Sequence, residues 1–319
     1  MYRYILKRLL LVLPVLLGVS FIVYVALDLA PGDIVDMIAP ENATIEEKEQ
    51  MREEMGLNRN IIVRYADYMG DLLHGDMGTS YTTGEPVWDM FMQKAPNTLK
   101  LGFVSVLLAV VLSLPLGIYA ALHRGTWKDN LSMVLALTGL SMPNFWLGLL
   151  LIVLFSVKLK WLPSGGDEGL LCLILPAITV GTGMMATMTR TTRSSMLDVI
   201  RQDYLRTARA KGVPEREVIS KHALKNALIP IITIVGTQLG AVMGGAVLTE
   251  TVFSWNGVGR LIVEHMNSRD IPVVTGSIIM TTMFLCLVLL AVDLLYAVVD
   301  PRIKAQYSGG KGKKKDGKK

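Results

Sequence analysis

Residues that mark metal sites and disulfide-rich proteins are scarce in this sequence. Its 319 residues include two cysteines and four histidines, and charged residues make up 18%. Cys172 and Cys286 form no CxxC motif and no disulfide framework, so we expect them to be packing residues. The histidines are too scattered along the chain to predict a metal cluster: His74, His123, His222 and His265.

Catalytic sequence patterns are missing as well. The chain contains no HExxH, no GxSxG and no complete Walker motif. We therefore predict that it is not an enzyme and has no ATPase site of its own, and we predict no catalytic residue, metal ligand or cofactor. The C-terminal string GGKGKKKDGKK resembles a phosphate loop only superficially, because no Ser or Thr follows its lysines.

Hydrophobic residues are abundant instead. They make up 51% of the chain, and the mean hydropathy is +0.44, values typical of a membrane protein. A membrane-spanning helix needs about 20 mostly apolar residues. Six segments meet that length: Leu9–Ala30, Leu101–Leu122, Leu131–Val157, Leu170–Met188, Leu228–Thr249 and Ile278–Val299.

The first span has an alternative interpretation, because basic residues precede it as they precede a signal peptide. Its apolar run is longer than the core of a signal peptide, and no small-x-small cleavage site ends it. We therefore predict an uncleaved transmembrane helix.

The distribution of lysine and arginine predicts the orientation. Basic residues are concentrated in the N-terminal segment, in residues 190–225 and in the C-terminal tail, whereas the first loop between spans is acidic. By the positive-inside rule, both termini are cytoplasmic. The net charge of +5 reflects this asymmetry and does not indicate nucleic-acid binding.

The first outer loop is predicted to form a small helical subdomain. Thr44 and Glu47 have the spacing of a capping box, which opens a short acidic helix ending by Gly56. Apolar residues at helical spacing from Ile61 predict a second helix that ends at Gly75, and Pro86 opens a third over Val87–Lys94. The subdomain either covers the outer end of the bundle or meets an external partner.

A polar island from Asp203 to Pro230 separates two apolar spans. Tyr204–Lys211 is rich in helix-forming residues, and Gly212 favours the left-handed conformation that ends a helix. Pro214 can then begin a second helix. In that second helix, Val218, Ile219, Leu224 and Leu228 alternate with basic residues, a mixed face suited to a groove in a partner protein.

This island resembles the cytoplasmic "EAA" loop of permease subunits of bacterial ABC importers. Arg206-Thr207-Ala208 stands where that family has Glu-Ala-Ala, Gly212 matches the family's glycine, and Ile229-Pro230 stands in place of its Leu-Pro pair. The changed triplet and the longer gap to the proline resemble the branch that carries oligopeptides, dipeptides and nickel. Further matches to that branch are Leu29-Ala30-Pro31-Gly32, Gly75-Asp76-Met77-Gly78-Thr79-Ser80, Glu250-Thr251-Val252-Phe253, Gly257-Val258-Gly259 and Tyr296-Ala297-Val298-Val299-Asp300-Pro301.

The resemblance implies the function and the partners. It implies a multi-pass permease subunit in the bacterial inner membrane that serves an ATP-driven importer of oligopeptides or dipeptides. The partners would be a second homologous permease, two cytoplasmic ATPases, an extracytoplasmic substrate-binding protein and the lipid bilayer. It also implies that the ATPases dock on the island, at Arg206, Thr207, Ala208, Gly212, Pro214 and Glu215.

Small residues in the fifth span form a second candidate site. Gly236, Gly240 and Gly244 fall on one helix face, where backbones can approach closely. They indicate packing within the chain, a subunit interface, or a smooth pathway wall that also includes Thr237 and Gln238. Met184, Met185, Met188 and Met243 would suit cargo of irregular shape.

Two acidic residues lie in or near the spans. Ionisable groups at membrane depth are functional suspects, and Asp293 in the sixth span is the stronger of the two. Glu250 lies near the outer end of the fifth span. We interpret both as interface residues at headgroup depth.

The predicted fold is an all-α polytopic membrane protein of about six transmembrane helices. Its parts are the N-terminal helix 1-30, the extracytoplasmic helical loop 31-98, a five-helix permease core 99-300 that contains the coupling loop 196-228, and a disordered lysine-rich tail 301-319. Alternatives are nickel import by the same family and an ion-coupled secondary transporter, which would show inverted repeats and midplane charges. An intramembrane enzyme would need a catalytic set within the spans, and none is recognised.

Overall fold

The chain folds into a bundle of helices. The computed structural model describes residues 2–299, except for the side chains of residues 2–5, 7, 8, 140, 243–245, 293 and 295–299. In this described part there is no strand, only an isolated bridge between Thr79 and Pro86. The helices are α1 (Tyr2–Leu29), α2 (Ile34–Ile38), α3 (Ile45–Glu54), α4 (Ile61–Leu73), α5 (Val87–Leu122), α6 (Trp127–Ser141), α7 (Asn144–Leu151), η1 (Ile152–Lys158), α8 (Leu171–Ile200), α9 (Asp203–Ala210), α10 (Glu215–Glu217), η2 (Val218–Ala223), α11 (Leu224–Gly245), α12 (Val247–Val252), α13 (Val258–Asn267) and α14 (Ile271–Val299).

Five of these helical runs are long and apolar enough to cross a membrane. They include α1, α5, α8 and α14, together with the continuous run from Glu215 to Val242 through α10, η2 and α11. A sixth span exists only as a bent pair, α6 with α7–η1. The second helix of the polar island and the fifth span are therefore one helical run, and Pro230 lies inside it.

The span predicted over Leu131–Val157 is not one straight helix, because its two halves meet at 94°. Met142 between them is extended, with φ −101° and ψ 133°. A residue before proline is pushed away from the helical region by the proline ring, and Pro143 has no N–H to continue the hydrogen-bond ladder. Pro143 instead serves as the N-cap of α7, so the apolar run turns at this point.

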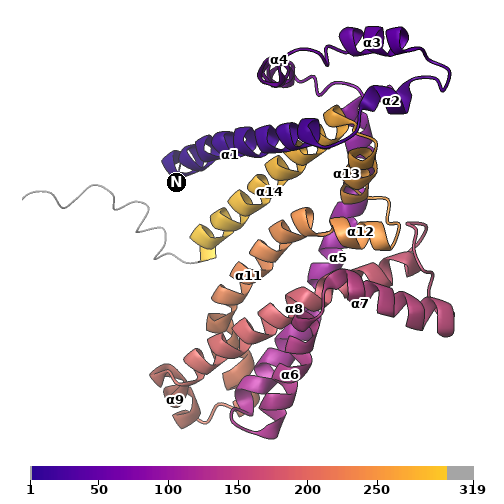
Figure 1. The fold of residues 1–319 in the computed structure, drawn as a ribbon. Coiled ribbons are helices and arrows are strands. Elements are labelled where there is room, and N and C mark those ends of the chain that lie inside the picture. Colours follow the sequence, from indigo (N-terminus) through magenta and orange to yellow (C-terminus); the bar gives the residue numbers. More distant parts are fainter. Residues whose placement is uncertain (1, 300–319) are drawn as a thin grey trace, which may run out of the picture.

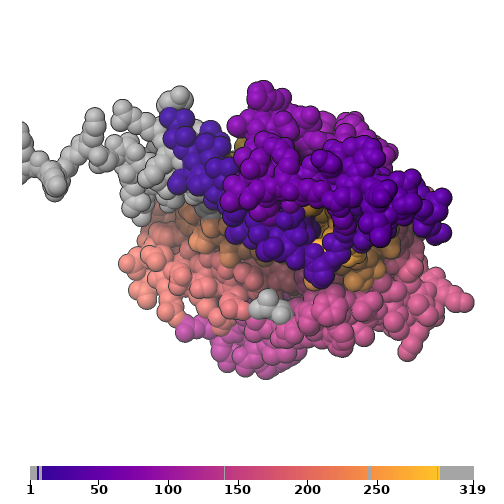
Figure 2. Space-filling model, turned by 45° about the horizontal axis from the view of Figure 1, so that its top comes forward, coloured from indigo at the N-terminus to yellow at the C-terminus, as the bar shows by residue number. Residues whose placement is uncertain are grey.

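The outer-loop helices lie at one end of the bundle, opposite α9 (Figure 1). The capping box is confirmed: Glu47 N–H donates to Thr44 Oγ1 over 3.3 Å, and Thr44 N–H donates to Glu47 Oε2 over 2.7 Å. Gly56 and Gly75 follow α3 and α4 with φ of +66° and +89°, which confirms both predicted helix ends. Figure 2 shows this indigo and violet region as one contiguous surface.

The third outer helix predicted over Val87–Lys94 is not separate. It is the start of α5, which continues through Pro96 to Leu122. The boundary drawn between residues 98 and 99 therefore falls inside a helix. The proline does not mark a helix end here, because a proline can remain within a long helix when neighbouring groups accommodate the lost hydrogen bond.

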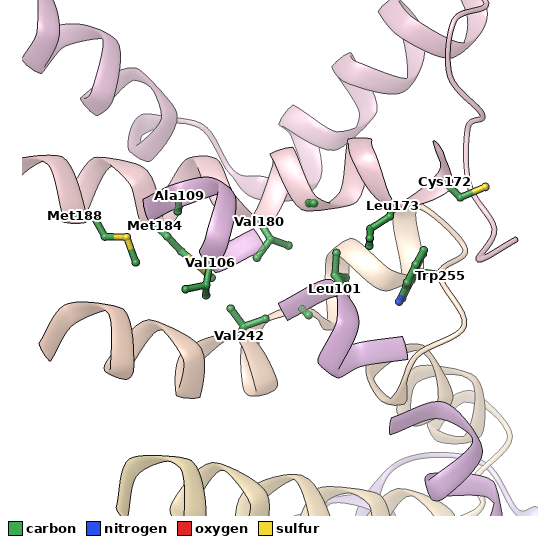
Figure 3. Close-up of a cluster of buried hydrophobic side chains, with 12 residues drawn as sticks. Leu101, Val106, Ala109, Cys172, Leu173, Val180, Met184, Met188, Val242 and Trp255 are labelled. Atoms are coloured by element: carbon green, nitrogen blue, oxygen red, sulfur yellow. The ribbon is translucent and has the colours of Figure 1, made fainter. Parts of the chain in front are cut away.

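The core of the bundle lies between α5, α8 and α11. Leu101 and Val106 of α5 meet Val180 and Met184 of α8 and Val242 of α11 in a buried cluster (Figure 3). Trp255, from the loop between α12 and α13, is fully buried in the same cluster. Cys172 also belongs to it, which confirms a packing role for this cysteine; Cys286 is half-buried.

Small residues let α5 and α8 approach closely. A Cβ added at Gly117 would lie 2.6 Å from Thr192 Cβ, and one added at Gly181 would lie 2.9 Å from the Ser105 carbonyl oxygen. Helices in membranes associate through such close backbone contact, since lipid offers no hydrophobic driving force. This pair forms the rigid centre on which the hairpin and the pocket described below are built.

Candidate functional site: a cytoplasmic hairpin and a pocket at the broken span

The hairpin begins with α9 and turns at a left-handed glycine. Gly212 has φ +75°, and its N–H donates to the Arg209 carbonyl over 2.9 Å. The predicted left-handed helix end is thus confirmed. Pro214 is the N-cap of α10, where its missing N–H costs nothing. The predicted helix, stop, helix pattern is present.

The apolar face of the hairpin is buried within its own chain. Leu205, Ala208 and Val218 are buried in one cluster with Met196 of α8 and Ala121 of α5. The prediction that this apolar face fits a groove in a partner is therefore wrong for Val218, which is fully buried, whereas Ile219 and Leu224 are half-buried and line an open pocket. Ile219 and Leu224 also pack against this cluster. Packing these residues against the cluster stabilises the chain, because it removes apolar surface from water.

The polar face of the hairpin is exposed and partly held by ion pairs. Arg206 and Thr207 are exposed on α9. Across the turn, Arg209 makes a bidentate pair with Glu215, with Nε–Oε2 and Nη2–Oε1 distances of 3.0 and 2.8 Å. An exposed pair of this kind adds little stability, but its fork geometry fixes the angle between α9 and the next helix.

Of the predicted hairpin residues, the structure leaves all but Ala208 at the surface. Thr207, Gly212 and Pro214 are exposed like Arg206 and Glu215, whereas Ala208 is 9% exposed. At the far end of the hairpin, Asn226 Nδ2 donates to Tyr204 Oη over 2.7 Å and so ties α9 to α11. The hairpin therefore protrudes from the surface between the end of α8 and the start of α11, held there by these contacts.

The glycines of the fifth span divide by position. A Cβ at Gly236 would lie 2.4 Å from Val292 Cγ1, and one at Gly240 would lie 2.9 Å from Leu285 Cδ1. Both glycines therefore let α11 pack on α14, which favours the intramolecular interpretation for them. The side-chain position of Gly244 lies outside the described residues, as do the side chains of Met243 and Asp293.

Gln238 lines a pocket, unlike Gly236 and Gly240 of the same span. It lines a pocket of about 310 Å³ that lies where α6 breaks into α7. The pocket brings Gln238 together with Met184, two residues singled out from the sequence; Thr237 is exposed beside it. The lining is Gly139, Met142, Asn144, Val180, Gly183, Met184, Thr187, Gln238, Ala241 and Val242.

Asn144 is the pocket residue that the sequence analysis did not identify. It is the first residue of α7, and a Cβ built on Gly183 would lie 3.4 Å from its Oδ1. Proline followed by asparagine inside an apolar span was the available signal. It marks a break whose polar residue must be accommodated by protein or water.

Two buried carboxylates hold the outer end of the bundle. Glu250 is fully buried within the chain, and its position at headgroup depth stays a prediction. It accepts hydrogen bonds from Thr98 Oγ1 over 2.7 Å and from the Arg260 N–H over 3.1 Å. Burial raises the pKa of Glu250 above its ordinary value, and these hydrogen bonds only partly oppose the rise. The carboxylate fastens α5 to the N-terminus of α13.

Asp270 fastens the outer loop in the same way. It is fully buried before α14 and accepts from Ser80 Oγ over 2.5 Å and from the Tyr81 N–H over 3.2 Å. Burial acts to raise the pKa of Asp270, but hydrogen bonds from His265, Ser80 and neighbouring groups bring it below its ordinary value. The Gly75–Ser80 motif thus positions a buried anchor.

The described residues contain no group of three or more His, Cys, Asp or Glu side chains that could hold a metal ion. The side chains at the hairpin and at the pocket can form hydrogen bonds and fit a partner by shape. The second half of the hairpin and the pocket lie on the same helical run, because the run that starts at Glu215 carries Gln238.

Residues 113–305 match the family described as binding-protein-dependent transport system inner membrane component, and residues 1–102 match the family of its N-terminal region. The chain is 41% identical over 304 residues to the glutathione transport system permease protein GsiC of Salmonella typhimurium, covering 95% of this chain and 99% of that protein. It is also 41% identical over 332 residues to the dipeptide transport system permease protein DppB of Alkalihalophilus pseudofirmus, covering 95% of this chain and all of that protein.

Among solved structures, an inward-facing conformation of the MetNI methionine ABC transporter has a similar fold. The TM-score is 0.58 at 18% identity, and the match covers 66% of this chain and 96% of that chain. This likeness shows the fold of the helical bundle.

Proposed function

The chain belongs to the family of binding-protein-dependent transport system inner membrane components, and we propose that it is the permease subunit of an ATP-driven importer of oligopeptides or dipeptides. It is a multi-pass protein of the bacterial inner membrane. The observation that carries the proposal is its near full-length similarity to permeases named for dipeptide and glutathione transport. Both names refer to short peptides.

The proposed assembly contains a second homologous permease, two cytoplasmic ATPases and an extracytoplasmic substrate-binding protein. The exposed polar face of the hairpin supports ATPase docking, because Arg206 and Thr207 are accessible while the apolar face is already used internally. Movement of the hairpin would reach the pocket through one continuous helical run from Glu215. A site that binds the motor and a site that meets cargo are thus coupled by one element.

The test is uptake by the complex reconstituted in liposomes with its own binding protein. We expect ATP-dependent accumulation of labelled di- to pentapeptides. Uptake of nickel at low concentration with no uptake of peptides would overturn the proposal in favour of nickel import. Peptide uptake driven by an ion gradient without ATP would overturn it in favour of a secondary transporter.

A further inference from the structure

We propose that the side-chain amides of Asn144 and Gln238 form hydrogen bonds with the backbone amides of a passing peptide and do not select among its side chains. The inference rests on the proposed function and names the chemistry by which the pocket meets its cargo. The two residues come from different elements, α7 and α11, and line the same pocket.

The pocket lies where the predicted third span bends between α6 and α7. The last carbonyls of α6 have no partner within their helix, as at every helix end. Backbone without a regular hydrogen-bond ladder is tolerated at membrane depth only where it is buried in protein or lines a cavity. Here the interrupted backbone at the 94° bend lines a cavity, because Met142 and Asn144 on either side of the break are both pocket residues.

The lining of the pocket is mostly apolar and uncharged, with Asn144, Thr187 and Gln238 as its polar residues. None of its ten residues is ionisable. In the described part of the chain, neither the Asn144 nor the Gln238 carboxamide makes a side-chain hydrogen bond, although the hydroxyl of neighbouring Thr237 bonds to its own helix at Ile234 O over 2.9 Å. Asn144 is exposed and Gln238 is half-buried, so both carboxamides are open to an occupant that can form hydrogen bonds.

A carboxamide carries both a donor and an acceptor, which match the carbonyl and the N–H of a peptide bond. Every peptide offers these groups at each peptide bond, whatever its sequence. A fixed charge would select cargo by its side chains, and the lining has none.

The remaining lining suits variable side chains. Met142 and Met184 are flexible and adapt to irregular apolar shapes. Gly183 leaves room beside Asn144, because a Cβ built on Gly183 would already lie 3.4 Å from Asn144 Oδ1. A volume of about 310 Å³ is at the small end of ligand pockets, so it would hold a segment of a peptide at a time.

The experiment compares two cargoes in the reconstituted complex at saturating loaded binding protein. One is a labelled tripeptide, and the other is its analogue in which an ester replaces one peptide bond, which removes one N–H donor. We expect wild type to turn over the amide cargo about fivefold faster than the ester, the worth of about one hydrogen bond.

Gln238→Met and Asn144→Leu keep side-chain size but remove the carboxamide. In either variant we expect amide turnover to fall and the amide-to-ester ratio to approach one. Thr233→Val is the matched control on the same helix, since Thr233 does not line the pocket, and its ratio should stay at the wild-type value. ATPase activity stimulated by the binding protein reports whether each variant is assembled.

The outcomes separate the two proposals. No uptake of either cargo by wild type overturns the proposed function, and the inference with it. Uptake with a wild-type ratio near one, or with a ratio unchanged in both variants, overturns only the inference. Equal loss of both cargoes in the variants, with stimulated ATPase intact, also overturns it, because a purely structural role would act on both alike.

Discussion

At the scale of single residues, the positions that matter most here are those where a side chain or its absence decides the backbone. Gly212 is one of them. A Cβ added there would meet nothing within 4 Å, so any effect of substitution comes from the left-handed backbone alone. This makes the position a clean probe of the turn between α9 and α10.

Gly212→Val should impair transport while the chain still inserts in the membrane. A β-branched residue is costly at φ +75°, so the turn would shift and misplace the face that docks the ATPases. We expect loss of peptide uptake and weaker co-purification of the ATPases. Gly212→Asn is the control, since Asn tolerates this conformation. Normal uptake and normal co-purification of the Val variant would show that the coupling assignment is wrong.

At the scale of elements, a buried ion pair joins α6 to the central helix α8. Asp129 near the start of α6 is 3% exposed and binds Arg193 of α8 in a bidentate pair, with both N–O distances 2.7 Å. Asp129 also accepts from the Gly125 N–H over 3.0 Å. The pair holds the first half of the broken span against the central helix.

Asp129→Ala should destabilise the protein by about 2 kcal/mol. Removing one partner of a buried pair leaves the other unpaired and costs about 3–5 kcal/mol, a range reduced here because the Arg193 side chain is 26% exposed. Unfolding in detergent, followed by tryptophan fluorescence, measures the change. Glu264→Gln is the control, because it breaks an exposed pair with Arg260 and should cost less than about 0.5 kcal/mol. Equal effects of the two substitutions would contradict the structural role of the buried pair.

At the scale of the whole molecule, the structure places the acidic outer-loop helices and the basic hairpin at opposite ends of the bundle (Figure 1). The outer-loop helices and the hairpin therefore lie on opposite sides of the membrane, and the orientation of the chain decides which side each faces. The distribution of basic residues predicts that the hairpin is cytoplasmic.

Single-cysteine variants at Glu46 and Lys211 test this orientation with an impermeant maleimide on intact cells. Both positions are exposed, and Glu46 avoids the capping box that Glu47 closes. The background lacks Cys172 and Cys286. We expect labelling of the Glu46 variant from outside, and of the Lys211 variant only after permeabilisation. The reverse pattern would invert the topology.

The sequence by itself determined the class of the protein and where several of its helices begin and end. Apolar run lengths predicted the membrane spans, because crossing the hydrocarbon core demands them. The capping box at Thr44 and the left-handed Gly212 were also predictable, since cap and turn chemistry acts within a few residues. The quoted motifs indicated the family.

Only the tertiary structure decided which surfaces are free. From sequence, Val218 suited a partner's groove and Gly236 suited a pathway wall, but the chain uses them for its own core and for packing on α14. Gln238 and Asn144 line one pocket because α6 bends away at Pro143 and α11 passes beside the break. Residues 94 positions apart come together only through packing, which periodicity cannot report because it describes one helix at a time.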